Sequence, residues 1–527
     1  MIFLFLYDII TCRHADREIS GLCFHYDGRR VTVAAFRIMA GKNRFIRFLI
    51  NAQKTPWYPA LFAALCIIAG TNNHTVYIPI LWVLASFVLF SVFFTDDNKV
   101  FLTPLLMIFF ALGCDTSSDA FVNSNGEMLS FMDDNAFVQV VILCVVCVGS
   151  LLIRLIDDGS VVAAFKKRRL FTWSIVAMDV AFLASGLFSP VSEIKNLGYG
   201  ALLAMGFTVV YFLVSGMLEK SENPVTYACY AMLGTAYVAF TQIMTVVIEK
   251  YINNDLIIIY GATNPGHEII KINKDELTLG WGISTVISAV FVLGIPAAMY
   301  LAKKSKWSFL MYFSAPLFLL GTVIINCRAA MIIGFVALVF CAVVGCITGK
   351  NKVAIRIYTV ILALAVIAFA IYVHVKVMPL SVLIEKLADV LRLVESNPLT
   401  ETGRMDLWKN GLEDFRSAPV FGVGFNDGGY PAELRSNNFY SNMYHCILVQ
   451  IPAAMGIVGC LAFIFHIIHL IKLCFKKFSV DRLFIVMIPC MILGMSLVDN
   501  FFFYLHFQIF YGVFIAIAEK MMNGETN

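Results

Sequence analysis

Three residues combine a charge or a titratable ring with a position beside an apolar segment: Arg328, Arg404 and His445. An arginine presents paired N–H donors that match phosphate oxygens, so two arginines at one membrane surface suit a diphosphate. A nearby histidine can accept a proton from a hydroxyl group near neutral pH. Together they indicate transfer of a group from a diphosphate to a hydroxyl. A lipid-linked diphosphate sugar would place its chain in the bilayer and its leaving group at the interface.

Each of these residues also has an ordinary structural interpretation. Arg328, in the segment INCRAAMIIGF, could anchor a helix end at the headgroups, although such anchors favour the cytoplasmic side. Arg404 could lie on a solvated helix face beside Glu401, and His445 could be a hydrogen-bonded residue at a helix start. The functional interpretation is favoured because an arginine at the hydrocarbon edge is costly, and because all three residues fall at the same membrane face.

The elements that must position these residues are membrane helices. Apolar residues make up 60% and charged residues 14% of the 527-residue chain, and the mean hydropathy is +0.82, beyond what a water-soluble domain shows. The net charge is only +4, so no nucleic-acid partner is expected, and the 14 cysteines lie mostly inside apolar runs without metal-ligand spacing. The composition predicts an all-α polytopic membrane protein.

Apolar runs of about 20 residues, enough to cross the hydrocarbon core, predict about 12 to 14 transmembrane helices. The candidate spans lie near residues 57–71, 76–94, 99–114, 136–156, 170–188, 196–217, 225–248, 280–301, 307–326, 329–348, 353–377, 443–471, 482–498 and 500–518.

The distribution of Lys and Arg predicts the orientation, because these residues are held on the cytoplasmic side of short membrane loops. Basic clusters fall on one side of the predicted spans, at 166–169, 303–306, 349–356 and 472–482. A lead-in (1–56) and a tail (520–527) are then cytoplasmic and flank a membrane domain (57–519). The large loop 378–442 is outside.

Two short helices are expected within this outer loop. Residues 380–395 have apolar side chains at three- and four-residue spacing, which predicts an amphipathic helix on the membrane surface. A second helix is predicted to begin after Thr402 and to stop before Pro419.

The second helix is expected to place Arg404, Trp408 and either Leu412 or Phe415 on one side, with Glu413 on the other. Trp408 should pack beneath the helix at 380–395 with its ring in lipid and its indole N–H in water, as an indole does at a membrane interface.

The run FGVGFNDGGY that follows contains Gly422 and Gly424 and has the composition of a turn. A glycine-rich loop can also cradle phosphate through its backbone N–H groups. Because no Walker pattern is present, a reversing turn is favoured over a phosphate cradle.

These segments resemble the O-antigen ligase and O-antigen polymerase family of bacterial membrane glycosyltransferases. The similar block runs from about residue 320 to 475 and contains NCRAAMIIGF, GRMDLWKNGLEDFRSAPVFGVGF and HCILVQIPAAMGIVG. Cys446 stands where the family often has asparagine after the histidine, whereas the histidine and both arginines are present.

The resemblance implies a GT-C-like helical fold in the bacterial cytoplasmic membrane. It implies transfer of a glycan from an undecaprenyl-diphosphate-linked donor to an acceptor hydroxyl on a glycan or lipid-linked acceptor, at the extracytoplasmic face and without a metal or cofactor. Arg328 and Arg404 would hold the diphosphate, and His445 would activate or position the acceptor. Whether the chain is a polymerase or a ligase stays open.

Two other classes of function remain as alternatives. A transporter or flippase for lipid-linked sugars would also need many spans and buried arginines, but it predicts two pseudo-symmetric halves that the sequence does not reveal. A signalling or assembly protein without chemistry is the third possibility.

Overall fold

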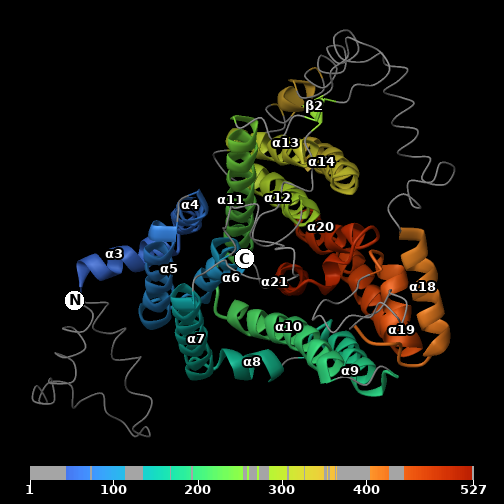
Figure 1. Cartoon of the computed structure of the whole chain (residues 1–527). Helices are drawn as coiled ribbons and strands as arrows, with labels where there is room; N and C mark the ends of the chain where they lie inside the picture. The colour runs from blue at the N-terminus through green and yellow to red at the C-terminus, as the bar shows by residue number, and fades with distance from the viewer. Residues whose placement is uncertain are drawn as a thin grey trace, which may run out of the picture.

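The chain is an all-α polytopic membrane protein, and its described residues include a short antiparallel pair of strands (Figure 1). The structure is a computed structural model that describes residues 43–71, 74–112, 134–166, 168–190, 194–252, 258–259, 270–271, 284–304, 308–325, 327–348, 353, 356–361, 364, 404–425 and 444–524. The strands β1 (Ile258–Ile259) and β2 (Ile270–Lys271) pair antiparallel.

The helices follow the predicted spans closely. In chain order they are α3 (Arg44–Gln53), α4 (Trp57–Thr71), α5 (His74–Phe94), η1 (Asn98–Phe101), α6 (Leu102–Leu112), α7 (Asp134–Asp157), α8 (Ser160–Lys166), α9 (Thr172–Phe188), α10 (Ile194–Leu218), α11 (Pro224–Ile252), α12 (Ser284–Lys304), α13 (Ser308–Ile324), α14 (Arg328–Thr348), α18 (Arg404–Ser417), α19 (Ile447–Phe475), α20 (Val480–Met495), η6 (Phe501–Phe503) and α21 (Leu505–Asn523).

Every predicted span coincides with a described helix except the one near 353–377, most of which lies outside the described residues. Among those residues, seven helices are long and apolar enough to cross a membrane, and four further apolar helices are shorter. The last predicted span, near 500–518, lies too early, since α21 begins at Leu505. Asp499 lies in the connection between α20 and α21, as it does between the two predicted spans.

Helix α12 lies at the centre of the packing and is buried along almost its whole length, in contact with α11, α13, α14 and α20. Gly294 permits this packing, since a Cβ there would come 2.7 Å from the Ala236 side chain and 2.9 Å from the Phe318 ring. By contrast, α7 and α14 expose apolar side chains such as Val145 and Val336, as expected for helices that contact lipid.

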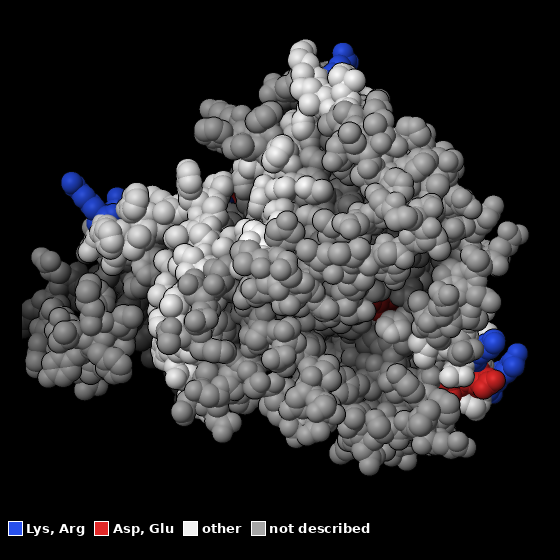
Figure 2. All heavy atoms as spheres, turned by 45° about the horizontal axis from the view of Figure 1, so that its top comes forward, with Lys and Arg blue, Asp and Glu red and all other residues white. Residues whose placement is uncertain are grey.

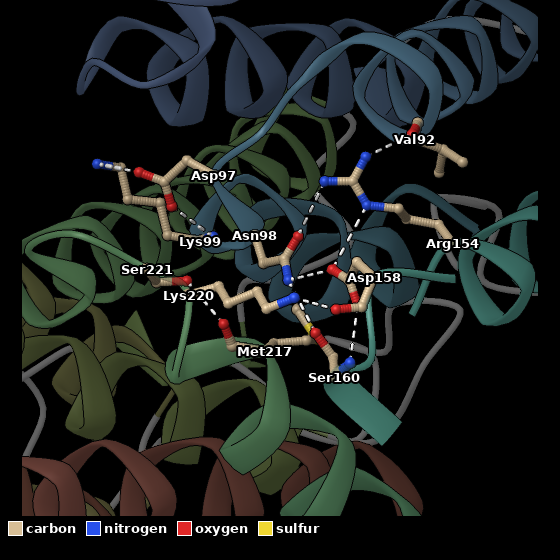
Figure 3. A network of polar contacts seen from close by, with 10 residues as sticks. All are labelled: Val92, Asp97, Asn98, Lys99, Arg154, Asp158, Ser160, Met217, Lys220 and Ser221. Atoms are coloured by element: carbon tan, nitrogen blue, oxygen red, sulfur yellow. Dashed lines mark hydrogen bonds and ion pairs between the residues drawn. The ribbon is translucent and has the colours of Figure 1, made fainter. Parts of the chain in front are cut away.

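A network of polar side chains closes one end of the bundle (Figure 3). Arg154, at the end of α7, is 2% exposed and donates to the Val92 carbonyl at 3.1 Å and to Asn98 Oδ1 at 3.3 Å. Its Nε lies 3.5 Å from Asp158 Oδ2, and Lys220 donates to the backbone carbonyl of Asp158. These contacts tie α5, η1, α7 and the α10–α11 turn together.

Further ion pairs join segments that the Lys and Arg pattern assigns to the cytoplasmic side. Lys303 and Lys304 at the end of α12 lie 2.5 and 2.6 Å from the carboxylate of Asp481 in α20, and Arg169 lies 3.0 Å from Glu219. On the face shown in Figure 2, most described charged side chains lie at the margins, including the sides where α3 and α18 lie in Figure 1.

Candidate functional site

Helix α18 has the bounds that its sequence predicts, beginning at Arg404 and ending at Ser417, before Pro419. Leu412 is 49% exposed, whereas Phe415 is half-buried. Helix α18 packs along α19.

The indole of Trp408 has a different environment from the one expected. Its Nε1–H donates to the backbone carbonyl of Tyr444 at 3.0 Å, so the prediction that this N–H faces water is wrong. The expected cover, the helix at 380–395, lies outside the described residues. Trp408 therefore connects α18 to the residue that precedes His445.

The loop after α18 packs against an interruption in helix α19. Gly456 has a φ of +62° and interrupts the helix, which leaves backbone groups without their usual partners. The connecting loop supplies them: Ile457 N–H donates to the Pro419 carbonyl at 2.8 Å. An irregular backbone inside a membrane domain is stable only where such groups are satisfied by protein or water.

Gly422 and Gly424 allow the loop after α18 to pack against the interrupted part of α19. Both have positive φ (+73° and +89°), and a Cβ at Gly422 would overlap the Ala454 backbone. The Gly422 N–H donates to the Ala418 carbonyl and the Gly424 N–H to the Ala454 carbonyl, at 2.9 and 3.0 Å. Because these N–H groups are bonded within the protein, this geometry disfavours a phosphate cradle at residues 421–425. The rest of the predicted turn, residues 426–430, lies outside the described residues.

The two arginines each open a helix: Arg328 is the first residue of α14 and Arg404 the first residue of α18. The positions of their side chains lie outside the described part of the structure. Their helix-start positions agree with the sequence prediction, while their proximity to His445 stays a prediction.

His445 is paired with a residue that the sequence interpretation missed. Its Nδ1 lies 3.0 Å from Oδ1 of Asp499, whose side chain is 4% exposed, whereas the histidine side chain is 37% exposed. An ionised carboxylate only accepts hydrogen bonds, so this contact places the proton of a neutral imidazole on Nδ1. The Nε2 lone pair is then available to accept a proton.

Asp499 is held firmly in place. Its Oδ1 also accepts from the Asn500 N–H at 2.7 Å and lies 3.4 Å from the Tyr504 hydroxyl. The Asn500 amide donates to Gln450 Oε1 at 3.0 Å, which ties this connection back to α19. Asp499 could have been found from the sequence as a carboxylate between two apolar runs, on the same predicted face as His445.

This arrangement can perform general-base chemistry. A buried carboxylate fixes the imidazole tautomer and stabilises the imidazolium that forms when Nε2 takes a proton. Within the described ranges, no group of three His, Cys, Asp or Glu side chains is placed to hold a metal ion.

Comparison with known families identifies the block that carries these residues. A family model described as O-antigen ligase matches residues 313–464, which include most of α13, all of α14 and α18, most of α19 and the residues Arg328, Arg404 and His445. No curated protein matches the chain. The match supports a glycan-transferring enzyme of polysaccharide assembly in a membrane. Residues 313–464 of this multi-pass membrane protein are thus similar to the O-antigen ligase family, which supports the family resemblance seen in the sequence.

Proposed function

We propose that this protein transfers a glycan from an undecaprenyl-diphosphate-linked donor to an acceptor hydroxyl without a metal ion. The observation that carries the proposal is the His445–Asp499 pair at the start of α19, since it is a general base with its orienting carboxylate. The match to the O-antigen ligase family supports the substrate class.

The residues divide the reaction between them. Asp499 fixes Nδ1–H of His445, and Nε2 accepts the proton of the acceptor hydroxyl as its oxygen bonds to the anomeric carbon. The bond from that carbon to the phosphate oxygen breaks, and the electron pair leaves with the lipid diphosphate. Arg328 and Arg404 would bind the departing diphosphate by charge-assisted hydrogen bonds, in place of a cation.

We also propose that the site faces outside and that both termini are cytoplasmic. The support is the segregation of ion pairs such as Lys303–Asp481 and Arg169–Glu219 at the end opposite His445 in the predicted span order. A cysteine introduced at Asn437 should react with an impermeant reagent in intact cells. Labelling only after the membrane is broken would overturn this orientation.

The test of function is reconstitution of the purified protein in vesicles with an undecaprenyl diphosphate oligosaccharide. Chain extension without a separate acceptor would indicate a polymerase, and transfer only to an added lipid or glycan acceptor would indicate a ligase. Movement of a labelled donor between leaflets, with no new glycosidic bond, would instead support a flippase and contradict the proposal.

A further inference from the structure

The residue immediately before His445 is fixed more tightly than His445 itself. Tyr444 is fully buried, and its hydroxyl donates to Oδ2 of Asp414 at 2.6 Å. Its backbone N–H donates to Gln450 Oε1 at 2.9 Å, and its backbone carbonyl accepts from Trp408 at 3.0 Å. The side chain and both backbone polar groups of Tyr444 are therefore engaged.

The contacts from α18 come from one stripe of that helix. Trp408, Gly411 and Asp414 follow one another at three-residue spacing, so they lie on the same face. A Cβ at Gly411 would come 2.9 Å from the Tyr444 ring and 2.5 Å from the Val449 side chain, so the helix and the tyrosine touch closely there. Trp408 therefore bonds to the backbone of Tyr444, Gly411 contacts its ring, and Asp414 accepts from its hydroxyl.

These contacts to Tyr444 are important because the next residue, His445, has a backbone conformation that is rare for residues other than glycine. His445 has a φ of +51°, a left-handed conformation that residues other than glycine rarely adopt. Such a conformation persists only where the surroundings hold it. On one side of His445 the chain is held by Tyr444, and on the other Ile447 N–H donates to the Ser496 carbonyl at 2.8 Å.

We infer that α18 sets the position of the His445 imidazole through Tyr444, with Asp414 and Trp408 as positioning residues. The inference rests on the proposed function of His445 as the base. Because Arg404 opens the same helix one turn before Trp408, a movement of α18 that accompanied donor binding would also move the base. The helix would thereby link donor capture to alignment of His445.

The test is Tyr444→Phe, which removes one hydroxyl and keeps the buried ring. Misalignment of a catalytic group by about 1 Å can lower a rate by about 10²-fold, so we expect kcat to fall by about tenfold to a hundredfold with KM for the donor nearly unchanged. Tyr227→Phe is the matched control: Tyr227 is also buried, its hydroxyl donates to the Gln53 carbonyl at 3.0 Å, and it should keep the native kcat.

The second measurement separates positioning from general support of the fold. In a His445→Ala background, Tyr444→Phe should lower the residual transfer rate no further, because the tyrosine acts through the histidine. An equal fractional loss in both backgrounds, or a native kcat for Tyr444→Phe, would overturn the inference. A native transfer rate for His445→Ala alone would instead remove the proposed function on which it rests.

Two further variants keep the test decisive if Tyr444→Phe does not fold. Trp408→Phe removes the indole N–H that reaches the Tyr444 carbonyl, and Asp414→Asn removes the negative charge that the hydroxyl meets. Each should lower kcat several-fold without raising KM for the donor. A rise in KM at an unchanged kcat would place α18 in donor binding alone and overturn its role in positioning the base.

Discussion

The two ends of the bundle both contain buried polar side chains, but these side chains differ in how fully they are hydrogen-bonded and in their exposure to solvent. In the network of Figure 3, the Arg154 guanidinium meets two oxygen acceptors and a carboxylate, and it is almost inaccessible to solvent. At the other end, Asp499 is equally buried, yet the His445 side chain it holds is 37% exposed and uses only Nδ1 within the described part of the chain. A fully bonded network stabilises the fold, whereas the His445–Asp499 pair leaves one imidazole nitrogen without a partner among the described residues.

The largest effect should come from removing the carboxylate of the His445–Asp499 pair. Asp499→Ala deletes the group that orients His445 and stabilises its imidazolium, so the transfer rate should fall by about 10²- to 10⁴-fold. Asp499→Asn loses the charge and replaces one acceptor oxygen by an NH2 donor, but it keeps the other oxygen, so it should retain more activity than the alanine variant. Steady-state transfer by the purified variants in vesicles measures both. Native activity of Asp499→Ala would show that the pair plays no part in the reaction.

The end of the bundle that contains Arg154 should respond in stability rather than in rate. Arg154→Met leaves Asp158 buried beside an uncharged side chain, and breaking a buried ion pair in this way costs about 3 to 5 kcal/mol. Thermal unfolding in detergent should show the loss, while the rate per folded molecule stays native. The control is Lys54→Met, whose partner Asp96 is 71% exposed, and it should cost about 1 kcal/mol or less. A lower transfer rate per folded molecule in Arg154→Met would contradict the proposal that this end of the bundle contributes to stability alone.

A smaller effect is expected from the arginines that open α14 and α18. Arg328→Lys and Arg404→Lys keep the positive charge and lose the two-pronged geometry. Loss of one charge-assisted contact corresponds to about 1.5 to 3 kcal/mol, or about a tenfold to hundredfold loss in donor affinity or rate. Titration of donor binding, scored separately from transfer, measures this. If both lysine variants bound and transferred as the native protein does, the diphosphate would have to be held elsewhere.

Local patterns in the sequence were sufficient for the helices but not for the contacts between them. The end of α18 before Pro419 and the described spans up to α20 follow from hydropathy and helix-stop signals. The start of α21 did not, because the apolar residues Phe501–Phe503 look like a helix start but form a short, buried 3-10 turn.

The site was predicted only in part, because its contacts join residues that lie far apart in the sequence. His445 was singled out because a histidine opens an apolar helix, but its partner Asp499 is 54 residues away and is brought close only by tertiary packing. The sequence predicts that the indole N–H of Trp408 faces water at the membrane interface. It donates instead to the backbone carbonyl of Tyr444, which is 36 residues away. Contacts of this kind carry no local pattern in one sequence.

The central claim is that His445 removes a proton in the chemical step and does not hold the donor. The most direct test measures donor binding and glycan transfer in the same preparation of His445→Ala. The account predicts binding close to native and a transfer rate lower by about 10²- to 10⁴-fold. Native transfer, or a loss of transfer fully matched by a loss of donor affinity, would contradict it.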